Sequence, residues 1–69
     1  MKFKEFLQVT DKNAKVQVFV EMYGMKFSTN HFSGYYTGDN TDPALLEKEV
    51  DRIYSTIVGG IPTLSVSLK

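Results

Sequence analysis

His31 is the only histidine of the chain and the residue best suited to acid–base chemistry, because imidazole titrates near neutral pH. A general base also needs a carboxylate that orients it, and Asp39 is the nearest one in the sequence. A serine–histidine–aspartate arrangement would have to be assembled on a small scaffold around this one imidazole. The pattern therefore predicts no catalytic residues and a protein that is not an enzyme.

The residue types in this sequence give little support for a metal-binding site or a phosphate-binding site. The chain has no cysteine and one histidine, so it lacks the ligand set of a zinc site. Asp39, Asn40 and Asp42 offer oxygen ligands, but their spacing is not that of a calcium-binding loop. The glycines of GYYTGDN match neither the P-loop nor the dinucleotide-binding pattern. We expect no metal, no cofactor and no cofactor-binding residues.

Aromatic residues give the clearest candidate for a functional surface. The stretch HFSGYYTGDN at residues 31–40 holds the histidine, a phenylalanine and two tyrosines beside two glycines. These rings could anchor a loop on a small core, or they could form a recognition surface, since tyrosine is enriched at interfaces. The candidate interaction surface combines them with two rings of a predicted strand: Phe19, Tyr23, His31, Phe32, Tyr35 and Tyr36.

Length and charge limit the class of protein. A chain of 69 residues forms one domain, residues 1–69, and its 42% hydrophobic content is too high for a disordered protein. Eight basic and eight acidic residues cancel, whereas a nucleic-acid binder usually has a basic excess. No apolar run approaches the roughly 20 residues of a membrane span, so we expect a cytoplasmic protein with no membrane contact.

The first half of the chain predicts a short helix and a β-hairpin. In KFKEFLQV the positions of Phe3, Phe6 and Leu7 favour a helix with one apolar stripe, although the segment also fits a strand. KVQVFVEMY alternates with a period of two, and Gly24 indicates a hairpin turn near Tyr23. Phe19 and Tyr23 lie opposite the valines, so this strand carries apolar groups on both faces.

The second half predicts a further helix and hairpin after a loop rich in tyrosine and glycine at about 31–41. Asp42 followed by Pro43 is a typical helix start, and ALLEKEV continues the helix. Residues 50–58 fit either a longer helix or a strand, and the β-branched IYSTIV favours the strand. Residues 51–57 and 63–68 should then pair across a turn at residues 59–62.

These elements predict an α+β fold in one small domain. It has two αββ halves, each a short helix plus a β-hairpin, and one antiparallel or mixed sheet. The strand face that carries the valines should be buried. The predicted core is Val16, Val18, Val20, Leu46, Val50, Leu64 and Val66.

Three segments of the chain resemble a known group of proteins. MKFKEFLQV, KVQVFV, and LLEKEVDRIYS followed by TLSVSL are similar to small uncharacterised α+β proteins of Firmicutes phages and mobile elements. The resemblance implies an α+β fold and such a host, and it carries no catalytic residues.

We therefore expect a non-enzymatic protein-interaction module of a phage or mobile element. Its partner would be an unknown protein or a second copy of itself in a homodimer. The alternative is a weak nucleic-acid-binding accessory protein. It would use the lysines of the first half together with the loop aromatics, although the neutral charge disfavours nucleic acid.

Overall fold

The computed structural model describes residues 1–69 and contains two short helices and four strands, which confirms the α+β class. The elements follow one another as α1 (Phe3–Gln8), β1 (Lys15–Met22), β2 (Met25–Phe32), the 3-10 turn η1 (Ser33–Tyr35), α2 (Pro43–Leu46), β3 (Val50–Val58) and β4 (Ile61–Leu68). Neither helix is long and apolar enough to cross a membrane.

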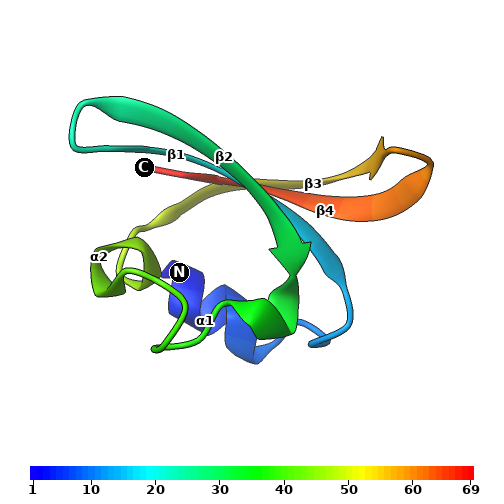
Figure 1. The fold of residues 1–69 in the computed structure, drawn as a ribbon, viewed down its shortest axis with the longest axis horizontal. Coiled ribbons are helices and arrows are strands. Elements are labelled where there is room, and N and C mark those ends of the chain that lie inside the picture. The colour runs from blue at the N-terminus through cyan, green and yellow to red at the C-terminus, as the bar shows by residue number, and fades with distance from the viewer.

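The four strands form one mixed sheet in the order β2-β1-β4-β3 (Figure 1). Each hairpin is antiparallel, and the two hairpins join through the parallel pair of β1 and β4. The hairpins are not placed equivalently, because the first strand of one and the second strand of the other are central. The division into two αββ halves therefore stays a prediction.

The first hairpin turns at Tyr23 and Gly24, as the glycine indicated. Both residues have positive φ, 54° and 74°, and Met22 pairs directly with Met25 across this two-residue loop. Positive φ at both central positions is typical of the tight turns that match strand twist. Glycine adopts this conformation without cost, whereas Tyr23 adopts it against its steric preference.

The second hairpin confirms that residues 50–58 form a strand rather than the end of a long helix. β3 pairs with β4 across Gly59 and Gly60, and the predicted pairing of 51–57 with 63–68 is part of this longer ladder. The side chain of Asp42 caps α2, since its Oδ1 accepts a hydrogen bond from the Ala44 N–H at 2.9 Å. The predicted helix start is therefore correct.

α2 is nevertheless shorter than the predicted ALLEKEV helix, which is a correction to the sequence prediction. The helix ends at Leu46, and residues 48–50 run beside the N-terminus instead. The Phe3 N–H donates to the Lys48 carbonyl at 2.9 Å, and the Val50 N–H donates to the Met1 carbonyl at 2.8 Å. These long-range hydrogen bonds replace the ones that a further helical turn would have formed.

The core lies between the valine face of the sheet and the helical layer. Of the predicted core, Val16, Val18, Val20 and Val66 are buried, while Leu46, Val50 and Leu64 are half-buried against it. The remaining buried apolar side chains are Phe3, Phe6, Met22, Tyr36 and Leu68. The two phenylalanines come from the apolar stripe of the predicted first helix, so that helix performs the expected role.

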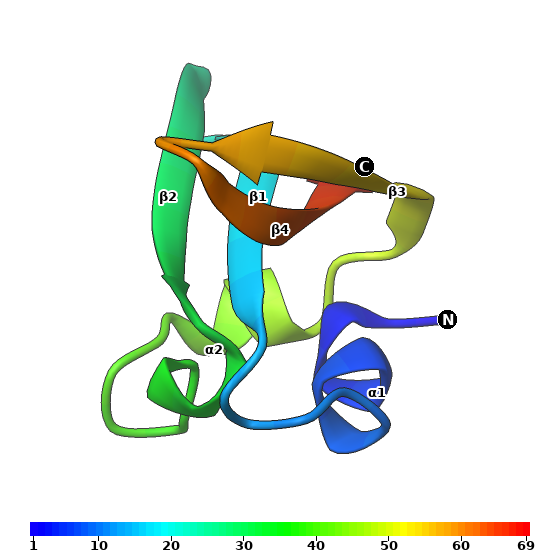
Figure 2. The ribbon, with the colours of Figure 1, turned by 90° about the vertical axis from the view of Figure 1, so that its right-hand side faces the viewer.

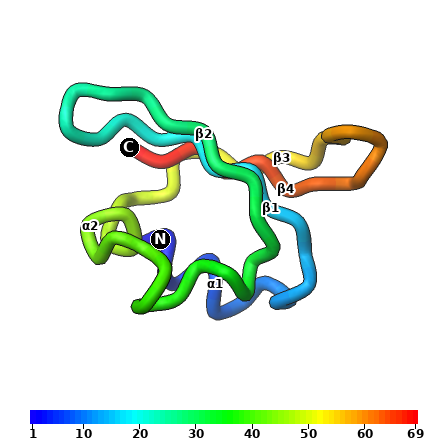
Figure 3. The backbone as a smooth tube through the Cα atoms, in the orientation of Figure 1, coloured from blue at the N-terminus to red at the C-terminus, as the bar shows by residue number.

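One face of the sheet carries all the other elements. α1, α2 and the chain between β2 and α2 lie below the sheet in Figure 2, and the tube in Figure 3 follows the loop along the same side. No helix covers the opposite face, which is called the open face below, although Thr63 and Ser65 on this face are buried. The two hairpin tips lie at opposite ends of the molecule: the β1–β2 tip lies above α2, whereas the β3–β4 tip extends beyond the helical layer (Figure 1).

Candidate functional site

The tyrosines of the 31–41 loop have different roles in the structure. Tyr36 is 7% exposed and packs edge-on against Phe3, with 5.4 Å between the ring centroids. Its hydroxyl shares a hydrogen bond of 2.9 Å with the Thr29 hydroxyl. Burial raises the pKa of the Tyr36 phenol. Tyr36 therefore belongs to the core, which corrects its assignment to an exposed surface.

His31 and Tyr35 form a second part of the same aromatic group. Their rings stack at 3.9 Å between centroids, and both rings meet Tyr36 edge-on. His31 is half-buried and Tyr35 is 42% exposed. No carboxylate forms an ion pair with the imidazole, so Asp39 does not orient His31 in the structure. These rings hold the loop on the helical side.

Backbone contacts attach the loop to the segment that follows α1. The Ser33 N–H donates to the Ala14 carbonyl at 2.8 Å, and the Gly34 N–H donates to the Lys12 carbonyl at 2.9 Å. A Cβ atom at position 34 would lie 3.2 Å from that carbonyl oxygen, so the close approach favours glycine. The loop is thus held on the valine side and cannot cover Phe19.

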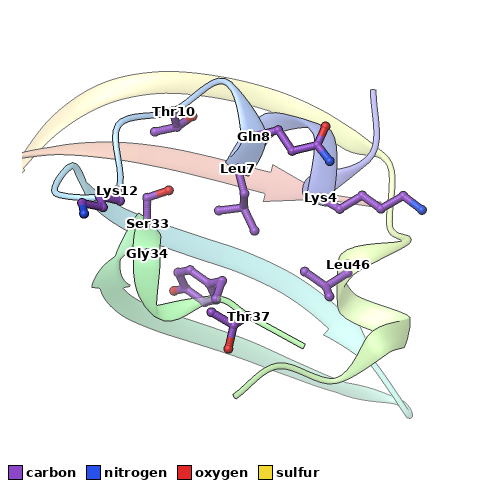
Figure 4. Close-up of a pocket in the computed structure, with 10 residues that line it drawn as sticks. Lys4, Leu7, Gln8, Thr10, Lys12, Ser33, Gly34, Thr37 and Leu46 are labelled. Carbon is purple, nitrogen blue, oxygen red and sulfur yellow. The ribbon is translucent and has the colours of Figure 1, made fainter. Parts of the chain in front are cut away.

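The largest cavity, about 300 Å³, lies between α1 and this loop (Figure 4). Its apolar lining comes from Leu7, Tyr36 and Leu46, and its rim carries lysine, glutamine, serine and threonine side chains. Lys4 is already paired with Glu47 at 2.7 Å. The lining contains no histidine or carboxylate. Throughout the chain, no group of three or more metal-ligating side chains comes together.

Tyr23 is placed apart from the other candidate residues, at the tip of the first hairpin. Its hydroxyl donates to Asp42 Oδ2 at 3.0 Å, and this hydrogen bond raises the pKa of the phenol. The contact ties the hairpin to the start of α2. Beneath it lies an apolar hollow of about 220 Å³ that Met22, Phe27 and Leu45 help to line. Tyr23 is a tether between two elements in this arrangement.

Phe19 and Phe32 are the two candidate residues that lie on the open face. Phe19 is on the central strand β1, between Ser28 on β2 and Ser67 on β4, and it is 37% exposed. Phe32 is at the end of β2, opposite Lys15. The pattern of alternation placed Phe19 correctly on the face opposite the valines.

Tyr54 is a third ring on the open face, and the sequence-based candidate surface missed it. It pairs with Ser65 of β4, which in turn pairs with Gln17 of β1, so all three lie on the same face. The side chains of Gln17 and Ser65 are joined by a hydrogen bond of 3.4 Å. The alternation within RIYSTIV would have identified Tyr54 once this segment was known to be a strand.

Charged groups surround these rings on the open face. Lys15 Nζ lies 4.8 Å from the centroid of the Phe32 ring, within the range of a cation–π interaction. Glu21 stands directly opposite Lys26 across β1 and β2, so their charges offset each other. Arg52 is the cation on the β3 side and pairs with Ser67. The open face is thus aromatic with a small cationic excess.

A hollow of about 210 Å³ lies beside Phe19. The parallel pairing of β1 and β4 ends at Phe19 and Ser67, one residue before the end of β4. Lys26 and Leu68 also line the hollow. A side chain from another molecule could enter this space and contact the exposed part of the Phe19 ring.

The structure therefore divides the predicted candidate surface into three places. Tyr35 and Tyr36 join His31 in the loop, Tyr23 tethers a hairpin tip, and Phe19 and Phe32 lie on the open face. Comparison of the chain with protein-family models, curated proteins and solved structures finds no match.

Proposed function

We propose that this chain is a non-enzymatic protein-interaction module, of the kind encoded by phages and mobile elements. It would act in the cytoplasm and bind a partner protein through the open face of its sheet. The observation that carries the proposal is the exposure of Phe19. A ring on a central strand would ordinarily be covered by a second layer, and in this chain every helix and loop lies on the other side.

The composition of the open face supports protein as the class of partner. Phe19 and Tyr54 are surrounded by small serine and threonine side chains, so their rings are the main apolar groups that project from this surface. Large rings beside a hollow are typical of the residues that contribute most to protein–protein binding. The small cationic excess favours a partner that presents apolar groups within an acidic rim.

Site-specific photo-cross-linking tests this proposal in cells. A photoreactive phenylalanine analogue placed at position 19 should give a discrete adduct with one protein, because the probe replaces a ring of similar shape. Val9 provides the matched control, since it is 79% exposed at the C-cap of α1, on the side of the molecule opposite the open face. The same analogue at position 9 should give no such adduct.

Competition by unlabelled protein establishes that the adduct reports the open face. Excess wild type should abolish the adduct, whereas excess Tyr54→Ser protein should compete much less well, since it lacks a ring of the binding surface. Urea melts of Tyr54→Ser should confirm that the competitor is folded. Equal labelling from positions 9 and 19, or equal competition by both proteins, would contradict the proposal.

Single-stranded nucleic acid is the second candidate partner, and one observation favours it. The open face brings three rings together with Lys15, Lys26 and Arg52, which is the combination that stacks bases and contacts phosphates. In the sequence these groups are far apart, so the combination exists only in the folded chain. The offsetting Glu21 and the zero net charge are the reasons to place this function second.

A salt titration separates the two candidates. Three phosphate contacts would give a slope of about −2 in a plot of log affinity against log salt for a single strand. Anisotropy of a labelled oligonucleotide measures this slope, and Phe19→Ser should weaken the binding if bases stack on that ring. The protein-interaction proposal expects no binding of the oligonucleotide at physiological salt.

A further inference from the structure

The outer edge of β3 is a surface separate from the open face. β3 is at the end of the sheet, and only its first residues have a second neighbour, where Val50 pairs with Met1. From residue 51 to residue 58 no backbone hydrogen bond is made outside the ladder with β4. The chain also has no charged residue between Ile53 and Leu68. Such an edge is a template for pairing with another strand.

Hairpin geometry shows which residues of β3 present their backbone groups outward. Val58 and Ile61 close a two-residue loop and therefore exchange two hydrogen bonds. Because such pairs alternate along an antiparallel ladder, the N–H and carbonyl groups of Ile53, Ser55 and Ile57 point away from β4. The partner of Ile57 is Pro62, which has no N–H to donate, in agreement with this alternation.

The other edge of the sheet is protected at the equivalent positions. Met22 and Met25 close the first hairpin, so the outward positions of β2 include Lys26, Ser28 and Asn30. A lysine on an edge strand disfavours pairing with another strand, because its charge would have to leave water. β3 has isoleucines where β2 has a lysine and an asparagine, so the two edges differ in this one respect.

We propose that β3 pairs with β3 of a second copy of this chain, in antiparallel orientation and with the two-fold axis at Ser55. In this register Ile53 lies opposite Ile57 of the second copy, and Ser55 lies opposite its own counterpart. All three outward-facing residues then form hydrogen-bonded pairs. The dimer would contain a continuous eight-stranded sheet with both open faces on the same side.

A second copy is favoured over a strand of a different protein because the β3 edge is complementary to itself in this register. The outward backbone groups of Ile53, Ser55 and Ile57 all find partners, and the exposed isoleucines lie opposite each other. Ile57 is 71% exposed and Ile53 is 44% exposed, and the pairing places each against the other. A shift of the register by one pair in one direction would put the Asp51 carboxylate opposite Ile57, and a shift in the other direction would put Ile53 opposite Gly59 in the hairpin loop. The net charge of each copy is zero, so no net electrostatic repulsion opposes the association of two copies.

Sedimentation equilibrium over a range of concentrations tests the dimer. One strand pair makes a small interface, so association should be weak and should become visible as the concentration approaches roughly millimolar. The mass should rise from 7.8 kDa toward twice this value. Ile57→Lys should raise the dissociation constant at least roughly tenfold.

Ile61→Lys is the matched control for this variant. Ile61 is on the same hairpin tip and is 51% exposed, but its N–H and carbonyl face β3, because it forms a hydrogen-bonded pair with Val58. Its substitution adds the same charge and should leave association unchanged. A wild type that remains monomeric at millimolar concentration, or equal weakening by both variants, would overturn the proposed pairing.

Cross-linking tests the register independently. The chain has no cysteine, so Ser55→Cys introduces a single thiol, which the two-fold axis brings to about 5.5 Å from its counterpart, Cα to Cα. A short bis-maleimide should then yield covalent dimers in high proportion. Ser28→Cys, at the middle of the β2 edge, should yield few. Equal yields would overturn the assignment of the dimer to β3.

These experiments are distinguishable from those on the open face. Phe19 and Tyr54 point away from the isoleucine side of the sheet, and the cross-link from position 19 does not require dimerisation. A monomeric wild type that still forms the adduct from position 19 would overturn the pairing alone. A dimer whose position 19 labels nothing would overturn the proposed function alone.

Discussion

Substitution of Tyr36 tests whether the 31–41 loop is anchored in the core. Tyr36→Ala removes a ring that is 7% exposed and that contacts Phe3, His31 and Tyr35. Removal of a buried aromatic side chain costs about 3–5 kcal/mol through lost burial and the cavity that remains. A chain of 69 residues has a total stability of only about 3–10 kcal/mol, so this variant should lose a large fraction of its stability.

Tyr36→Phe divides this cost into its parts, because it keeps the ring and removes the hydroxyl. The loss of its hydrogen bond to Thr29 should cost about 1 kcal/mol. Tyr35→Ala is the matched control on the adjacent residue. That ring is 42% exposed and its removal should cost about 1 kcal/mol, mainly through the lost stacking on His31.

Urea melts followed by circular dichroism measure these free energies of unfolding. The expected order of destabilisation is Tyr36→Ala far above Tyr36→Phe and Tyr35→Ala. Equal losses for the two alanine variants would refute the reasoning, since they would show that the loop is not attached through Tyr36. An unchanged urea midpoint for Tyr36→Ala would show that the loop leaves the core in solution.

The burial of Tyr36 can also be tested through the dependence of stability on pH, because burial changes the pKa of the phenol. Burial raises this pKa above the ordinary value of 10.0, so the folded state keeps the phenol proton longer than the unfolded chain does. The stabilisation is complete below pH 10.0 and is lost as the pH rises through the pKa of the folded state. Tyr36→Phe should therefore lose less stability than the wild type over this alkaline range.

Two further predictions concern the core and the ion pairs of the helical layer. Val18 is 1% exposed on the central strand, so Val18→Ala should lower the free energy of unfolding by about 1–3 kcal/mol, and a near-neutral result in urea would contradict the assignment of the core face. Hydrogen bonds from Lys2 and Lys4 lower the pKa of Glu47 to about 2. The stabilisation from this carboxylate is present above the unfolded value of 4.5 and is lost as the pH falls toward about 2. Urea midpoints of Glu47→Gln should accordingly lie below those of the wild type at neutral pH and converge with them near pH 2, and salt should reduce the difference because the pairs are exposed.

Local features of the chain were sufficient to predict most of the elements. The alternation of Val16, Val18 and Val20 defines one face of β1 from neighbouring residues alone, because side chains of a strand alternate between faces. Gly24 and Asp42 mark a turn and a helix start through their own conformational and hydrogen-bonding preferences. The length of α2 was wrong because Met1 and Phe3, far away in the sequence, hydrogen-bond the residues expected to continue it.

The arrangement of these elements was decided by the tertiary structure. No local preference specifies that β1 and β4 pair in parallel, and this pairing leaves β3 at a free edge. The loop aromatics illustrate the same limit, since Tyr35 and Tyr36 are neighbours in the sequence but one is exposed and the other is core. The sequence by itself determined which residues form strands and turns, because those preferences act between near neighbours. Only the folded chain decided which rings share the open face and which strand lacks a partner, because both depend on pairing between strands far apart in the sequence.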